Sequence, residues 1–167
     1  MILKTSPAQC AHYKDIFMPI KIISNELTAT HKREVRKEFE KITISLEVGQ
    51  PGNYKHIISA IEELGCSKNK LKRTLSNYLM AIYIYLGLPE SQDAHLEVMT
   101  IFDFKYEKQL LATLLYFVNT DDVIPDHIAY IGYLDDAYCV NLALQGQNSS
   151  VKEELESIVK ALEALEV

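Results

Sequence analysis

The feature that most limits the possible folds is the spacing of apolar residues, which is helical along most of the chain. Its clearest case is the stripe Leu71, Leu75, Leu79, Ile82 and Leu86, whose steps of three and four place the side chains on one face of a helix. No segment alternates apolar and polar residues for more than a few positions, as a half-buried strand would. We therefore predict an all-α fold, a single-domain bundle of about seven or eight helices.

Capping residues, glycines and prolines divide this pattern into separate helices. Ser6 and Pro7 begin the first one, which Pro19 is expected to kink or split. Ser150 and Glu153 have the spacing of a capping box and begin the last one. The predicted helices cover residues 6–27, 30–49, 53–64, 67–86, 91–102, 104–118, 133–145 and 150–165.

Length and composition are those of an ordinary globular domain. The chain has 167 residues, of which 48% are hydrophobic and 24% charged. Its apolar runs are shorter than the roughly 18 to 20 residues of a membrane helix, and the N-terminus has no secretory signal. The three cysteines form no CxxC pair and are expected to be reduced. These features predict a soluble, cytoplasmic protein without a membrane partner.

Charge is distributed unevenly between the two halves of the chain. Residues 1–88 carry 13 Lys and Arg against 8 Asp and Glu, a balance of +5, whereas residues 89–167 carry 4 against 15, a balance of −11. The two balances together give the net charge of −6. Such a distribution can steer a charged partner towards the protein, or it can draw the two halves together within the fold.

Residues 119–136 contain five aspartates among a proline, a glycine and apolar side chains. Asp121 or Asp122 can accept hydrogen bonds from amides near Pro125, because aspartate is a favoured capping residue. Asp135 and Asp136 lie at the expected start of a helix, where the dipole stabilises a negative charge by roughly 0.3 to 1 kcal/mol. Capping alone therefore accounts for most of the segment.

A divalent metal site is the alternative interpretation of the same aspartates. Mg²⁺ and Mn²⁺ prefer hard oxygen ligands, and His127 can join such a set. The spacing matches neither a calcium-binding EF-hand loop nor a His-Glu-x-x-His motif. The candidate metal ligands are Asp122, Asp126, Asp135 and Asp136.

The segment 110–144 resembles the core of the YkvA-like family, a bacterial family of unknown function. The positions that carry the resemblance are Asp122, Ile124, Pro125, Asp126, Gly132, Leu134, Asp135 and Asp136. The chain departs from the family pattern at Asn119, Thr120, Asp121, His127 and Ala129. The resemblance implies a helical fold but no particular reaction. It makes residues 104–146 a family-like core within one domain, 1–167, on which a helical part, 6–102, packs.

Residues 58–79 resemble a helix-turn-helix, with Gly65 at the turn and a basic second helix. The fit fails at Ile61, where that motif expects a small residue, and the second helix continues into an apolar run. A further basic run covers residues 31–37, but the glutamates at helical spacings from it predict a solvated helix face. The acidic net charge also argues against nucleic-acid binding, so this remains a second alternative.

Catalytic motifs are missing from the sequence, and no cofactor is expected. It contains no phosphate-binding glycine loop and no Gly-x-Ser-x-Gly. Ten tyrosines, several of them near the aspartate segment, are suited to protein interfaces. We therefore expect a non-enzymatic protein that binds another protein, either as an immunity protein against a cognate toxin or as a regulator. The expected partner-binding residues are Asp121, Asp122, Asp126, Tyr130, Tyr133 and Asp135.

Overall fold

The computed structural model describes residues 20, 27–48, 52–53, 56–88, 98–99, 108–118 and 133–166. Within these ranges the chain forms six helices and two strands of two residues each, so the predicted all-helical class is confirmed. The expected first helix, 6–27, lies almost wholly outside the described residues. The elements are α2 (Ala29–Glu47), β1 (Gly52–Asn53), α3 (Ile57–Gly65), α4 (Lys70–Tyr85), β2 (Val98–Met99), α5 (Lys108–Val118), α6 (Leu134–Gln145) and α7 (Ser149–Ala164).

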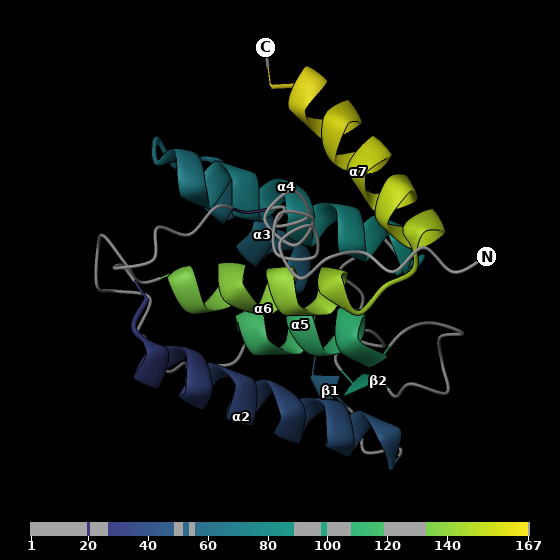
Figure 1. The fold of residues 1–167 in the computed structure, drawn as a ribbon. Helices are drawn as coiled ribbons and strands as arrows, with labels where there is room; N and C mark the ends of the chain where they lie inside the picture. The colour runs from purple at the N-terminus through teal and green to yellow at the C-terminus, as the bar shows by residue number, and fades with distance from the viewer. Residues whose placement is uncertain are drawn as a thin grey trace, which may run out of the picture.

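The helices form layers with α5 and α6 in the middle (Figure 1). Helix α2 packs against both of these central helices on one side, and α3 and α4 pack on the other. Helix α7 packs mainly against α4, at the outside of the bundle. The helices of the first half of the chain thus enclose the α5–α6 pair.

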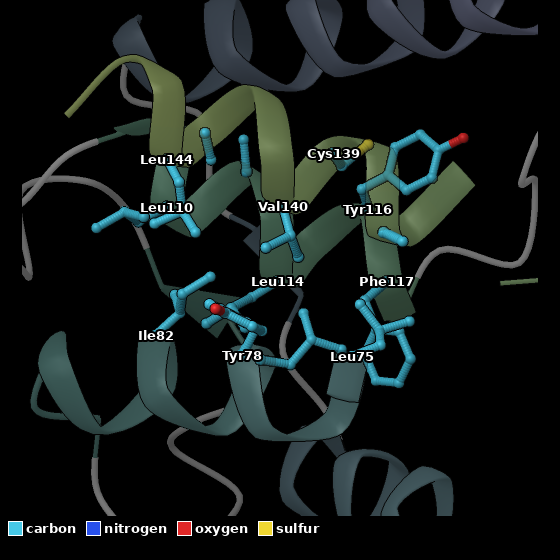
Figure 2. Packing of buried hydrophobic residues seen from close by; sticks show 14 of the residues in the cluster. Leu75, Tyr78, Ile82, Leu110, Leu114, Tyr116, Phe117, Cys139, Val140 and Leu144 are labelled. Carbon is cyan, nitrogen blue, oxygen red and sulfur yellow. The ribbon is translucent and has the colours of Figure 1, made fainter. Parts of the chain in front are cut away.

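The central position of α5 and α6 follows from their composition. Seven of the eleven residues of α5 are buried, and so are ten of the twelve residues of α6. A helix that is apolar around most of its circumference is stable in water only when other elements cover it. Figure 2 shows Leu110 and Leu114 of α5 with Val140 of α6 in the core that α4 closes with Leu75 and Ile82.

A buried asparagine ties the N-terminal part of the chain to this centre. The side-chain amide of Asn141 donates to the carbonyl oxygen of Ile20 at 2.8 Å, and its Oδ1 accepts from the Ile20 amide at 3.1 Å. Both residues are buried, so each polar group is satisfied without water. The pair joins positions that are 121 residues apart in the sequence.

Three predicted helix starts are shifted in the structure. Helix α3 begins after His56 and not at Asn53, and Asn69, not Ser67, caps α4. Asn148 caps α7 and accepts from the amide of Val151 at 3.0 Å, so Ser150 lies one residue inside that helix. In α4 and α7 a nearby asparagine therefore takes the place of the expected serine as the cap.

The predicted helix over 91–102 is wrong at Val98 and Met99. These residues form β2, which pairs antiparallel with Gly52 and Asn53 of β1. Val is favoured in strands. Its partner strand, Gly52 and Asn53, follows Pro51, and a proline there does not allow α2 to continue. The following helix, expected from residue 104, begins at Lys108 in the described part of the chain.

Candidate functional site

The N-terminal end of α6 holds two buried carboxylates. Asp135 and Asp136 occupy the first turn, as predicted, and are 0% and 1% exposed. The hydroxyl of Tyr116 on α5 donates to Oδ2 of Asp135 at 3.0 Å. The helix dipole and this hydrogen bond both favour the charged carboxylate, and they partly offset its removal from water.

Neither aspartate is the cap of α6. The cap position is Tyr133, which makes no side-chain capping hydrogen bond. Asp135 and Asp136 therefore stabilise the helix from within its first turn, and their carboxylates face the protein interior. With no exposed area, Asp135 has no surface to offer a partner in this conformation, unlike the half-buried Tyr133.

Cations from two other helices cover the tyrosines at this end. The Lys72 ammonium of α4 lies 4.8 Å from the centre of the Tyr133 ring. Nε of Arg36 on α2 donates to the Tyr138 hydroxyl at 2.6 Å, and its guanidinium lies 5.8 Å from the centre of that ring. The Lys72 contact is a cation–π interaction worth about 0.5 to 2 kcal/mol, whereas Arg36 lies beyond the Tyr138 hydroxyl and acts through its hydrogen bond. Here basic residues of the first half of the chain contact tyrosines of the second half.

The remaining residues of the predicted sites lie outside the described part of the chain. They are Asp121, Asp122, Asp126, His127 and Tyr130. They belong to the connection that leaves α5 after Val118 and enters α6 at Tyr133. Of the predicted metal ligands, the structure brings together Asp135 and Asp136. Among the described residues, no three His, Cys, Asp or Glu side chains are close enough to hold a metal ion.

Residues 58–79 do form two helices joined by a turn, but the second one is a core helix. Half of the residues of α4 are buried, and the helix packs against α3 and α7. Its basic residues have structural contacts: the Arg73 guanidinium donates to the carbonyl oxygens of Ser67 and Lys68 at 3.2 and 2.7 Å. Lys72 covers Tyr133, as described above. Nucleic-acid binding by this segment stays a prediction with little exposed helix to support it.

An open groove of about 420 Å³ lies between α2, α5 and α6. Apolar walls come from Phe39, Ile44 and Leu142, and its rim carries charges of both signs. The remaining lining residues are Arg36, Glu40, Thr43, Glu47, Lys108 and Gln109. Sequence reasoning missed this groove because its walls come from helices far apart in the chain. The sequence signal for it is Ile44, an isoleucine that lies outside the apolar stripe of its helix. In the structure this side chain is 57% exposed.

Comparison with known proteins gives a family match over the central helices. Residues 109–142 match the family model DUF1232, described as a protein of unknown function. The match bears out the YkvA-like resemblance over about a fifth of the chain, from α5 into α6. Neither a curated protein nor a solved structure matches the chain. Within the described ranges, no helix is both long enough and apolar enough to cross a membrane.

Proposed function

We propose that the protein is non-enzymatic and acts by binding another protein at the end of the bundle where α5 is connected to α6. The observation that carries the proposal is the fixation of Asp135 by Tyr116 within the core. Together with the Lys72 contact of Tyr133, it anchors the point at which the aspartate-rich connection enters α6.

The partner that suits this acidic segment is a protein with a basic patch. Residues 89–167 have a charge balance of −11, and three aspartates of that excess, Asp121, Asp122 and Asp126, lie within the connection. Complementary charge accelerates encounter and selects among partners. A cytoplasmic immunity protein for a basic toxin, or a regulator with a basic target, fits this description.

The test is affinity capture from the native host with matched variants. Asp121→Asn/Asp122→Asn/Asp126→Asn removes three charges from the connection, whereas the control Glu153→Gln/Glu154→Gln removes two exposed charges from α7. A stoichiometric partner that the wild type and the control retain, and that the triple variant binds at least tenfold more weakly, supports the proposal. Recovery of no stoichiometric partner, or equal recovery by all three proteins, refutes it.

A metal site is the second candidate, and the burial of Asp135 and Asp136 in one helical turn favours it. Burying two charged carboxylates is costly unless a cation, a proton or hydrogen-bond donors compensate their charge. Asp122 and Asp126 would complete an oxygen-rich ligand set for Mg²⁺ or Mn²⁺ with an enzymatic or sensor role. Titration calorimetry that detects no heat with Mg²⁺, Mn²⁺ or Ca²⁺, together with an unchanged melting temperature, excludes this candidate.

A further inference from the structure

The outer face of α2 is exposed from its first turn to its end. Two large apolar side chains stand on this face: Ile44 is 57% exposed and Val48, one turn later, is 69% exposed. The groove beside Ile44 continues the same surface towards α5 and α6. The residues that follow one another along this face at steps of four and three, all exposed, are Arg33, Lys37, Glu40, Ile44 and Glu47.

Charge along this face changes sign from one end to the other. Its N-terminal half carries the basic Arg33, Arg36 and Lys37 against the acidic Glu34, whereas its C-terminal half carries the acidic Glu40 and Glu47 against the basic Lys41. A second α2 laid antiparallel therefore places the half with a net positive charge opposite the half with a net negative charge, whereas a parallel arrangement places halves of the same net charge together. Opposite charges across an interface stabilise one orientation and disfavour the other.

We propose that this face binds the same face of a second copy of the chain, with the two α2 helices antiparallel about a two-fold axis at the level of Ile42. In this register Lys37 of each copy faces Glu47 of the other, Arg36 faces Val48, and Glu40 faces Ile44. The two Ile44 side chains lie on either side of the axis, next to the apolar walls of the two grooves. A two-fold axis requires such a self-complementary surface, because each residue pair occurs twice.

The charge of this face also makes it the suitable place for two acidic chains to approach. The chain as a whole carries −6. Repulsion between copies is smaller at this face than the net charge suggests, because nearby charges dominate at physiological ionic strength. The exposed residues of the face comprise four basic side chains, Arg33, Arg36, Lys37 and Lys41, against the acidic Glu34, Glu40 and Glu47.

The expected association is weak and sensitive to salt. One helix face with a bordering groove covers less than the roughly 800 Å² per partner of a stable complex. We expect a monomer–dimer equilibrium with a dissociation constant on the order of 10 to 100 μM, weakened further at about 0.5 M salt. Sedimentation equilibrium on the full chain measures this directly, in solutions up to about ten times that dissociation constant.

An apolar substitution series tests the location of the interface. Ile44→Asp places a charge beside the axis and should weaken self-association at least tenfold. Ile84→Asp is the matched control, because Ile84 on α4 is also exposed, at 45%, and lies on another helix. Equal loss of association in both variants, or in neither, overturns the assignment to α2.

A charge-swap experiment tests the antiparallel register. Lys37→Glu and Glu47→Lys should each be monomeric alone, because each creates two like-charge pairs across the axis. Mixed in equal amounts they should form a heterodimer. In that heterodimer the two substituted side chains face each other with opposite charges, and so do the two unchanged residues at these positions.

Two further results decide the outcome of the swap. Melting curves check that Glu47→Lys, which also loses its ion pair with Lys108, remains folded. A wild type that is monomeric throughout, or a mixture that stays monomeric while both variants are folded, overturns the proposal.

Discussion

The α5–α6 pair and helix α2 are in contact but differ in how much of their surface is exposed to water. The central pair is buried around most of its circumference and contains the segment with the family match. Helix α2 buries one stripe that includes Val35 and Phe39 and exposes charged residues along the rest of its surface. The comparison separates two tasks: the centre sets the fold and holds the aspartates in place, while the outer helix provides the surface proposed for self-association.

The largest expected difference between these regions concerns truncation of one apolar side chain. Leu114→Ala in α5 removes a side chain with no exposed area and leaves a cavity, so we expect a loss of about 2 to 5 kcal/mol of unfolding free energy. Ile44→Ala in α2 should change it by less than about 0.5 kcal/mol. Urea denaturation of both variants measures the difference, and similar losses would contradict the comparison.

A smaller effect is expected where the centre holds its buried charge. Tyr116→Phe removes the hydroxyl that donates to Asp135 and should cost about 1 to 3 kcal/mol, because the carboxylate stays buried with less stabilisation. The control is Tyr138→Phe, which removes a hydrogen bond to the exposed Arg36 and should cost less. If the control proves more destabilising in urea than Tyr116→Phe, the Tyr116–Asp135 bond is not an important part of the core.

The start of α7 allows a test of a single hydrogen bond outside both regions. Asn148→Ala removes the side-chain oxygen that accepts from Val151 and should cost about 1 kcal/mol. Ser150→Ala should be nearly neutral, since Ser150 lies within the helix and not at its cap. Thermal melting of the two variants decides between the observed cap and the one expected from the sequence.

The smallest expected effect is a loss of folding stability at high pH that is caused by the ionisation of Tyr78. Burial raises the pKa of this tyrosine, and its hydrogen bond to Glu156 at 2.7 Å raises it further. The unfolded chain loses the proton near pH 10 while the folded chain keeps it, so stability is fully present below about pH 10 and falls above it. At about pH 10.5 the unfolding free energy should have fallen by less than about 1 kcal/mol.

The variant Tyr78→Phe isolates this contribution. Its unfolding free energy should fall less than that of the wild type between about pH 9 and pH 10.5, because the titrating hydroxyl is gone. Parallel urea titrations across this range provide the measurement. Identical slopes for the two proteins would show that Tyr78 ionises equally in the folded and unfolded states.

Local sequence patterns predicted much of the fold, because the apolar residues that recur at helical spacings are the ones that become buried. The helix expected over 133–145 is α6 within one residue, and the helix expected over 30–49 buries Val35, Phe39 and Leu46, which recur in it at helical spacings. Exact helix starts were less predictable, since asparagine and serine are both favoured caps and Asn148 lies two residues before Ser150.

The candidate site was predictable only in part. The placement of Asp135 and Asp136 at a helix start follows from nearby sequence, and the structure has it. Their burial and the bond from Tyr116 depend on how α5 packs against α6, which no local pattern specifies. The same holds for Arg36 on Tyr138, which joins residues 102 apart in sequence.

The paired hydrogen bonds between Ile20 and Asn141 have a consequence for synthesis. When Ile20 is added to the growing chain, its partner is still 121 residues from being made, and at about 5 to 20 residues per second that delay is several seconds or longer. During that interval the apolar side chain of Ile20 has no finished core to enter. Ile20 therefore docks late, and a growing chain leaves it accessible to chaperones until α6 has emerged.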